Sequence, residues 1–343
     1  FEMTNYISMI NLNNFVLLLF IGINTYFFIN FKNIIFFHFI KDIPDKKRKL
    51  HGKPTSLAGG IILIVNILIY YFWACLNENI LTSESIFNSY NELNVFLFST
   101  LSIFIVGFFD DKYSLSPSLK FILLSLIISV TLMYDSNLNI LSLKFSFTEK
   151  ILHLENYSFI FTFFCLIVFL NAFNMFDGVN LQASTYALLI IFFISLFYSN
   201  DFLNKILLIF LIFYSFLNYQ NKSFLGDSGS LLLGFIIGYI FIKLYNYNKI
   251  IYSDEIIIFM LLPGFDLIRL FFIRILNKKN PLQPDRQHIH HILIKKFSLK
   301  KSLLIMQIMI FLPIALSLTE INKVLVILIF IVYYFFTIKK LDF

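Results

Sequence analysis

The chain has 343 residues, of which 59% are hydrophobic and only 14% are charged. A soluble globular domain cannot hide so much apolar surface, so the composition excludes that class and indicates a protein surrounded by lipid. The formal net charge of +7 would suit a nucleic-acid partner only if the basic residues formed a patch on a soluble face. They lie instead in loops between apolar stretches, so we expect no nucleic-acid partner.

The predicted elements, in chain order, are about eleven apolar helices of roughly 20 residues, the length that crosses a hydrocarbon core of ~30 Å. Their expected ranges are 12–38, 58–76, 93–109, 117–134, 157–176, 183–199, 203–219, 229–246, 254–276, 301–318 and 322–338. Segment 138–155 partly alternates apolar and polar residues and predicts a small outward-facing β-hairpin. We therefore expect an all-α integral membrane protein in which residues 1–343 form a single polytopic domain.

The orientation follows from the basic residues, which gather in the loops 41–53 and 277–301 and in the tail. Because cytoplasmic loops carry the excess of Lys and Arg, we expect the N-terminus outside and the C-terminus inside the cytoplasmic (inner) membrane. Nearly every unusual polar cluster then lies in loops on the cytoplasmic face, where we expect the active site. These loops are near 41–58, 110–116, 174–182, 220–230 and 277–300.

Two adjacent carboxylates, Asp110 and Asp111, close the third predicted span in GFFDDK. At a helix C-terminus such a pair opposes the helix dipole and repels itself, so it calls for a compensating cation. A solvated helix end with Lys112 as the counter-ion is one interpretation. A catalytic role is the other.

Asn171, Asn174 and Asp177 recur every three residues at the inner end of the fifth span and should share one helical face. Amides without partners in lipid cost several kcal/mol, so this face should meet protein, water or a ligand. A stripe of hydrogen bonds between helices remains an alternative to a substrate site.

Asp227 begins the eighth span in FLGDSGSLLLGF. Asp, Ser and Gly at a helix start are capping residues first of all. The same helix start would also leave backbone N–H groups for a phosphate, with Asp227 as a metal ligand.

His288, His290 and His291 lie with Arg286 in the basic loop PDRQHIHH. Zinc is disfavoured because it needs three or four convergent ligands and no Cys is near. Binding of a diphosphate through charge-assisted hydrogen bonds suits this loop better, and a loop that only faces lipid headgroups is the alternative.

Span 254–276 contains Pro263-Gly264, which should break or kink the helix. Asp266 and Arg269 lie three residues apart in it, and we expect them to form a structural ion pair. Together, the acidic sites and the basic loop on one membrane face predict a site for a phosphorylated ligand and Mg²⁺, with Mn²⁺ as the alternative ion.

The motifs DIPDKKRKLHGKPTSLAGG, GFFDDK, NAFNMFDG, FLGDSGSLLLGF and PDRQHIHH occur in this order over roughly 42–291. In this the chain resembles the polyprenyl-phosphate N-acetylhexosamine-1-phosphate transferases of glycosyltransferase family 4. It is most similar to the branch of undecaprenyl-phosphate N-acetylglucosaminyl 1-phosphate transferases, which start O-antigen and other cell-envelope polysaccharides. The resemblance implies transfer of a sugar 1-phosphate from a UDP-N-acetylhexosamine to a polyprenyl phosphate, with release of UMP.

Carried over by motif, the resemblance implies that Asp110 and Asp111 lie near the polyprenyl phosphate, with Asp110 as the base. Asp227 is similar to the family's Mg²⁺ ligand, and Asp177 serves both as a catalytic residue and as a metal ligand. The residues expected to contact substrate are Lys53, Asn171, Asn174, Asn180, Arg286, His288, His290 and His291. The chain departs from the family pattern DGxDGL at DGVNLQ, where Asn180 replaces the second carboxylate and Leu181 a glycine.

Two alternatives to this function stay open. Within the same class the runner-up is a peptidoglycan phospho-N-acetylmuramoyl-pentapeptide transferase. The alternative from another class is a membrane transporter or flippase, although such proteins place carboxylates near the midplane and often show inverted repeats. A homodimer is a further expectation.

Overall fold

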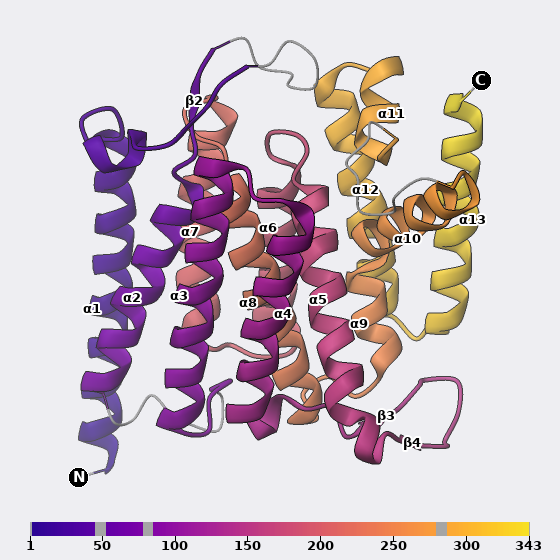
Figure 1. Ribbon diagram of the computed structural model, residues 1–343. Coiled ribbons are helices and arrows are strands. Elements are labelled where there is room, and N and C mark those ends of the chain that lie inside the picture. The colour runs from indigo at the N-terminus through magenta and orange to yellow at the C-terminus, as the bar shows by residue number, and fades with distance from the viewer. Residues whose placement is uncertain (1, 45–52, 78–84, 279–286, 343) are drawn as a thin grey trace.

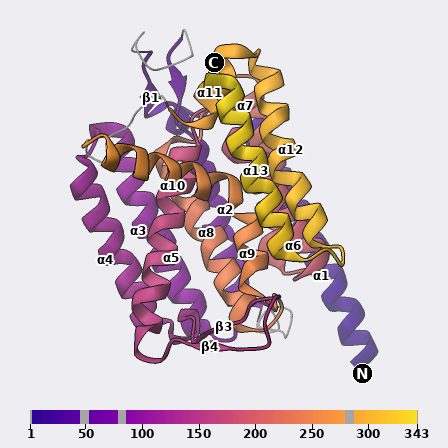
Figure 2. The same cartoon turned by 90° about the vertical axis from the view of Figure 1, so that its right-hand side faces the viewer.

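The computed structural model describes residues 2–44, 53–77, 85–278 and 287–342, and its long helices stand side by side in one bundle (Figures 1 and 2). The long helices are α1 (Glu2–Ile29), α2 (Gly59–Leu76), α3 (Tyr90–Tyr113), α4 (Pro117–Tyr134), α5 (Ser158–Phe176), α6 (Gln182–Phe197), α7 (Phe202–Tyr219), α8 (Gly226–Asn246), α10 (Leu261–Leu276), α12 (Leu299–Ser317) and α13 (Lys323–Asp342). The short ones are α9 (Ser253–Phe259), α11 (Ile289–Lys296) and the 3₁₀ helices η1 (Ile35–His38), η3 (Ser136–Leu138) and η4 (Glu155–Tyr157).

Seven helices in the described part of the chain are long and apolar enough to cross a membrane, or eight if the bent pair α9–α10 is one span. The apolar part of α1 (Asn13–Ile29) and α6 are shorter. These helices support the predicted class, an all-α membrane protein with several spans. The count of eleven and the orientation stay predictions.

Two short antiparallel strand pairs mark opposite ends of the bundle (Figure 1). β1 (Lys41–Asp42) pairs with β2 (Thr55–Ser56) at the end that carries α11 and the C-terminus. β3 (Ser142–Leu143) pairs with β4 (Leu152–His153) at the other end, inside the segment where a hairpin is predicted. Which side of a membrane this pair faces stays a prediction.

The first span differs from its predicted range of 12–38, because α1 ends at Ile29. The sequence Asn30-Phe31-Lys32-Asn33 follows, and polar groups there end the helix before the apolar run resumes in η1. Phe31 and Phe37 then stack on each other with ring centroids 5.5 Å apart. The apolar run therefore continues as a packed turn, which hydropathy alone does not separate from helix.

Helix α8 forms the centre of the bundle, and its apolar stretch is completely buried by the neighbouring helices. A helix that is apolar all round is expected in such a place, since no face needs water. It packs against α2, α3 and α5. Small residues permit the close approach: a Cβ added at Gly60 would lie 2.7 Å from the backbone N of Gly229, and one at Gly107 would lie 2.4 Å from Cα of Ser228.

One charged network lies within this centre, at the end of α8 far from its start. Lys243 is fully buried and pairs with Glu92 of α3 at 2.9 Å and with Asp135 after α4 at 2.8 Å. Tyr239 and Tyr247 donate hydrogen bonds to Asp135 and Glu92. A buried charge is tolerated when it is paired and hydrogen-bonded in this way.

The predicted break in span 254–276 is confirmed, but it lies before Pro263. The axes of α9 and α10 differ by 80° at Met260, and α10 runs across the bundle (Figures 1 and 2). Pro263 lies in the first turn of α10, where the missing N–H is one that no helical carbonyl needs. Proline therefore sits near the start of the second helix.

Replacing Gly107 by Ala should destabilise the bundle, because the new methyl group meets α8 backbone that cannot turn aside. We expect a loss of about 1–3 kcal/mol, typical of overpacking, measured as a lower melting temperature in detergent. Gly264→Ala is the matched control, since a Cβ there would meet no described atom within 4 Å. Equal melting temperatures for the two variants would contradict the packing of α3 on α8.

Candidate active site

The ends of α3, α4, α5 and α8 meet at the end of the bundle that carries β2 and α11. Four carboxylates, which we call the acidic cluster, lie there: Asp110, Asp111, Asp177 and Asp227. The first two end α3, the third follows α5, and the fourth belongs to the first turn of α8. The structure therefore brings together all four acidic residues that the sequence singles out at span ends.

Asp111 caps the start of α8. Its carboxylate accepts hydrogen bonds from the backbone N–H of Asp227 at 2.7 Å, from the N–H of Ser228 at 3.0 Å and from the Ser228 hydroxyl at 2.7 Å. Gly226 turns with φ +72°, and a Cβ there would lie 2.7 Å from Asp111 Oδ2. The prediction that these N–H groups are free to hold a phosphate is wrong, because a carboxylate of the protein itself occupies them.

Asp110 points to a different partner, Lys120 in the first turn of α4. The Lys120 ammonium lies 2.6 Å from Asp110 Oδ2, 3.4 Å from Asp227 Oδ2 and 3.2 Å from the Asn174 side-chain oxygen. Asn174 in turn donates to Asp227 at 2.6 Å. Lys112, the counter-ion in one of the two interpretations of this pair, instead places its ammonium 5.2 Å from the centre of the Phe39 ring.

Asp177 is the carboxylate of the cluster that has no hydrogen-bonding or cationic side-chain partner among the described residues. Within the described residues its carboxylate has no hydrogen bond or ion pair. Burial, together with the charges of Asp227 and Asp111, raises the pKa of Asp177 to about 8. A buried carboxylate facing two others is stabilised by any cation that enters.

This donor set fits Mg²⁺. The described residues contain no group of three or more Asp, Glu, His or Cys side chains already placed to hold a metal ion. Mg²⁺ does not need such a cage, since it commonly takes one or two carboxylates together with water and phosphate oxygens. Asp177 and Asp227 could supply those carboxylates.

His288 is held by Asp266 of α10. Its Nδ1 lies 2.7 Å from Asp266 Oδ2, and the same carboxylate pairs with Arg269 at 3.0 Å and accepts a hydrogen bond from Tyr334 at 2.8 Å. The predicted Asp266–Arg269 ion pair is confirmed. The sequence did not indicate that this pair also fixes the histidine ring.

His290 joins the histidine segment, which we define as His288, His290 and His291, to the acidic cluster. Its ring is parallel to that of His288, with centroids 5.5 Å apart, and a Cβ on Gly178 would lie 2.2 Å from its Nε2. Gly178 directly follows Asp177, so this contact sets the two halves of the site side by side. Burial, then the charges of His291 and His288, lowers the pKa of His290 to about 3, so His290 is a neutral hydrogen-bonding group at neutral pH.

The departure from the family pattern lies in the turn between α5 and α6. Asn180 hydrogen-bonds with Asn221, so its amide is engaged in the turn. Leu181 has φ +70°, a left-handed conformation that favours glycine and costs other residues roughly 1–2 kcal/mol. The side chain of Asn218 holds it there by accepting from its backbone N–H.

The remaining predicted substrate residues are Asn171, Lys53, His291 and Arg286. Asn171 donates to the Ile167 carbonyl of its own helix at 2.7 Å. Lys53 is exposed beside β2, and His291 lies against His290 with ring centroids 4.2 Å apart. Arg286 lies outside the described residues. Substrate contacts for these four stay predictions.

Lys120 is a site residue that was not predicted from the sequence. The sequence does contain an indication of its role. A lysine near the start of an apolar span is costly unless it has a partner, and Pro117 at the helix start places Lys120 in the first turn. The partner of Asp111 was not detectable in this way, since Asp111 and Asp227 are 116 residues apart.

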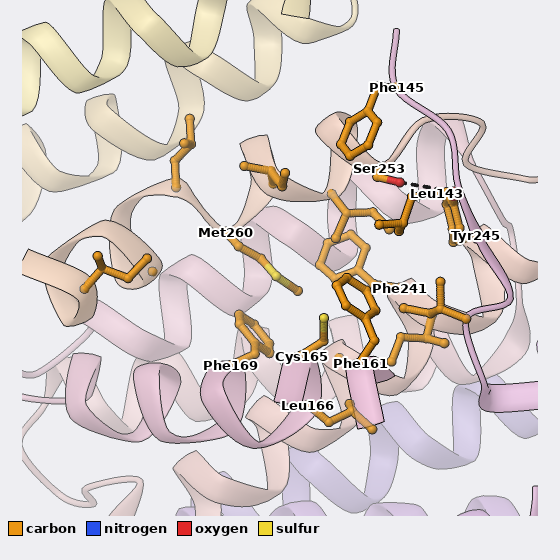
Figure 3. A pocket seen from close by; sticks show the side chains of 18 of the residues that line it. Leu143, Phe145, Phe161, Cys165, Leu166, Phe169, Phe241, Tyr245, Ser253 and Met260 are labelled. Carbon is orange, nitrogen blue, oxygen red and sulfur yellow. Dashed lines mark hydrogen bonds between the residues drawn. The ribbon is translucent and has the colours of Figure 1, made fainter. Parts of the chain in front are cut away.

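An apolar pocket of about 280 Å³ lies between α5, α8, α9 and α10. Figure 3 shows Cys165, Phe161 and Met260 at its centre. Gly264, Phe265 and other residues of α10 form part of its wall, and α10 also carries Asp266, which holds His288. One helix therefore borders both the pocket and the histidine segment.

Leu181→Gly should stabilise the protein, because glycine adopts φ +70° without strain. We expect a gain of about 1 kcal/mol, read as a higher melting temperature in detergent. Leu203→Gly in α7 is the control and should destabilise, since Leu203 is buried in a helix. A lower melting temperature for Leu181→Gly would show that the leucine side chain outweighs the backbone strain.

Comparisons with known proteins agree with this geometry. Residues 93–245, from α3 to α8, match the model of glycosyl transferase family 4. The relatives include the undecaprenyl-phosphate alpha-N-acetylglucosaminyl 1-phosphate transferases of Salmonella typhi, 26% identical over 72% of this chain and 67% of the relative, and of Thermotoga maritima, 26% identical over 77% and 76%. A probable undecaprenyl-phosphate N-acetylglucosaminyl 1-phosphate transferase of Bacillus subtilis is 26% identical over 71% and 67%. The matches confirm the resemblance carried by the ordered motifs: residues 93–245 are similar to glycosyl transferase family 4.

Proposed function

We propose that the chain transfers an N-acetylhexosamine 1-phosphate from a UDP-sugar to undecaprenyl phosphate and releases UMP. The observation that carries this proposal is the acidic cluster beside paired histidines at one end of an apolar helix bundle. Helix α10, which holds His288 through Asp266, also borders an apolar pocket. Such a site suits a reaction between a water-soluble diphosphate and a lipid phosphate. The names of the relatives, each an undecaprenyl-phosphate sugar 1-phosphate transferase, support the same reaction.

In this reaction a phosphate oxygen of the acceptor attacks the β-phosphorus of the UDP-sugar. A new oxygen–phosphorus bond forms as the bond to the UMP oxygen breaks, in line with the attack. Asp110 would keep the acceptor phosphate ionised, and Lys120 beside it would attract that phosphate. Asp266 would hold Nδ1 of His288 and so leave Nε2 for the diphosphate, with neutral His290 as a further hydrogen-bonding group.

Asp177 and Asp227 would hold Mg²⁺, or Mn²⁺ in its place. When bound, the ion supplies positive charge that neutralises the diphosphate. Asn174 would orient Asp227, because its amide donates to that carboxylate at 2.6 Å. Asp111 would keep the first turn of α8 in place, and with it the direction of the Asp227 side chain.

We propose the cytoplasmic (inner) membrane as the location, with the site facing the cytoplasm. The support is the excess of Lys and Arg in the loops 41–53 and 277–301 and in the tail. The reaction would be the first membrane step of O-antigen or another cell-envelope polysaccharide. A homodimer stays an expectation.

Purified protein in detergent should release UMP from UDP-N-acetylglucosamine when undecaprenyl phosphate and Mg²⁺ are present, and EDTA should abolish the release. Asp227→Ala should lower the rate about 100-fold or more. It removes a carboxylate that would hold the cation, and the cation's positive charge stabilises the diphosphate. Glu320→Ala, at an exposed turn after α12, is the matched control. Wild-type turnover by Asp227→Ala would refute the role of Asp227. Turnover with UDP-N-acetylmuramoyl-pentapeptide but not with UDP-N-acetylglucosamine would favour the peptidoglycan reaction.

If the apolar pocket holds the polyprenyl chain, filling it should weaken binding of undecaprenyl phosphate and leave binding of the UDP-sugar unchanged. We expect Cys165→Phe to raise KM for undecaprenyl phosphate about tenfold while KM for the UDP-sugar stays unchanged. Cys75→Phe is the control, because Cys75 is an exposed residue of α2 outside the pocket. Equal KM values for the acceptor in the two variants would place the chain elsewhere.

A further inference from the structure

The ammonium group of Lys120 contacts two of the four carboxylates of the acidic cluster. It reaches oxygens from three helices: Asp110 of α3 at 2.6 Å, Asn174 of α5 at 3.2 Å and Asp227 of α8 at 3.4 Å. The Lys120 side chain is only 14% exposed. These contacts surround a single positive charge with two carboxylate oxygens and one amide oxygen.

The same oxygen types are those that Mg²⁺ and Mn²⁺ prefer. A metal ion on Asp227 would lie close to the ammonium, because the ammonium is 3.4 Å from one of that residue's two oxygens. Two cations repel each other strongly at such separations in a partly buried site. The ion and the ammonium therefore cannot both keep these contacts at full strength.

Lysine is suited to move away from such a contact. Its charge sits at the end of four methylene groups, and its rotatable ammonium binds phosphate without the fixed geometry of arginine. α4 begins only at Pro117, so Lys120 lies one turn from the helix start. When a metal ion binds Asp227, the ammonium loses one negatively charged partner, and an incoming phosphate can replace it.

We propose that Lys120 and the divalent cation compete for the carboxylate of Asp227, and that metal binding moves the ammonium from Asp227 to a phosphate oxygen of the substrate. Lys120 is then a positioning cation that couples metal binding to phosphate binding. This inference rests on the proposed function, since it takes the phosphate from that reaction. The competition itself concerns metal binding and can be measured without turnover.

The test is a titration of purified protein with Mn²⁺, followed by the electron paramagnetic resonance signal of the free ion. Lys120→Met removes the charge and keeps an unbranched side chain, so we expect it to bind Mn²⁺ about tenfold tighter than wild type. Lys120→Gln, which can still hydrogen-bond Asp110, should show the same direction and serves if the Met variant does not fold. Lys120→Arg keeps the charge and should stay within about twofold of wild type.

Lys112→Met is the matched control, because it removes a nearby lysine charge whose ammonium lies over the Phe39 and Tyr113 rings. Its Mn²⁺ affinity should equal that of wild type. Unchanged or weaker Mn²⁺ binding by Lys120→Met and Lys120→Gln would overturn the proposal. So would an equal gain in Lys112→Met, which would reveal only a general effect of charge.

Turnover separates this inference from the proposed function. Lys120→Met should bind the metal better and yet release UMP more slowly, because its phosphate partner is lost. If wild-type protein binds Mn²⁺ competitively with Lys120 but releases no UMP from any UDP-sugar, the proposed function fails and the competition stands. If wild type turns over and the neutral variants gain no Mn²⁺ affinity, the function stands and the competition fails.

Discussion

The contact of Asp111 with the first turn of α8 is the constraint on which the site depends. α8 is buried along its apolar length, so its first backbone N–H groups need partners from the protein. The Asp111 carboxylate satisfies the N–H groups of Asp227 and Ser228, and its charge is favourable at a helix N-terminus. Because the cap comes from α3, it also fixes how α3 and α8 meet, and hence where Asp227 lies.

This contact explains how two adjacent aspartates are tolerated at a helix C-terminus that disfavours negative charge. Asp111 is stabilised by the positive end of α8, and Asp110 by Lys120 at 2.6 Å. Each carboxylate therefore has its own source of positive potential. The neighbouring residues therefore have different roles: Asp111 orients a helix, and Asp110 pairs with Lys120.

The sequence predicted those parts of the fold that depend on local pattern. The apolar run 93–109 became α3, and the polar stripe placed Asn174 and Asp177 at the site. Contacts between distant residues were beyond it, as the pairing of Asp111 with Asp227 and of Asp266 with His288 shows. The direction of α10 was also hidden, because a helix that crosses a bilayer and one that lies across a bundle can have the same composition. Asn171 has the spacing of the stripe but bonds to its own helix, which spacing cannot reveal.

The two ends of α8 carry the same kinds of charge with opposite consequences. At the far end, Lys243 is fully buried between Glu92 and Asp135, and two tyrosine hydroxyls donate to these carboxylates. Such a network is satisfied within the protein and serves to hold α3, α4 and α8 together. At the site end, Lys120 pairs with only two of the four carboxylates, Asp110 and Asp227, and Asp177 has no hydrogen bond or ion pair to a described residue. At one end of α8 the charges are therefore matched within the protein, and at the other end negative charge exceeds its described partners. In the proposed function that excess would attract a divalent cation.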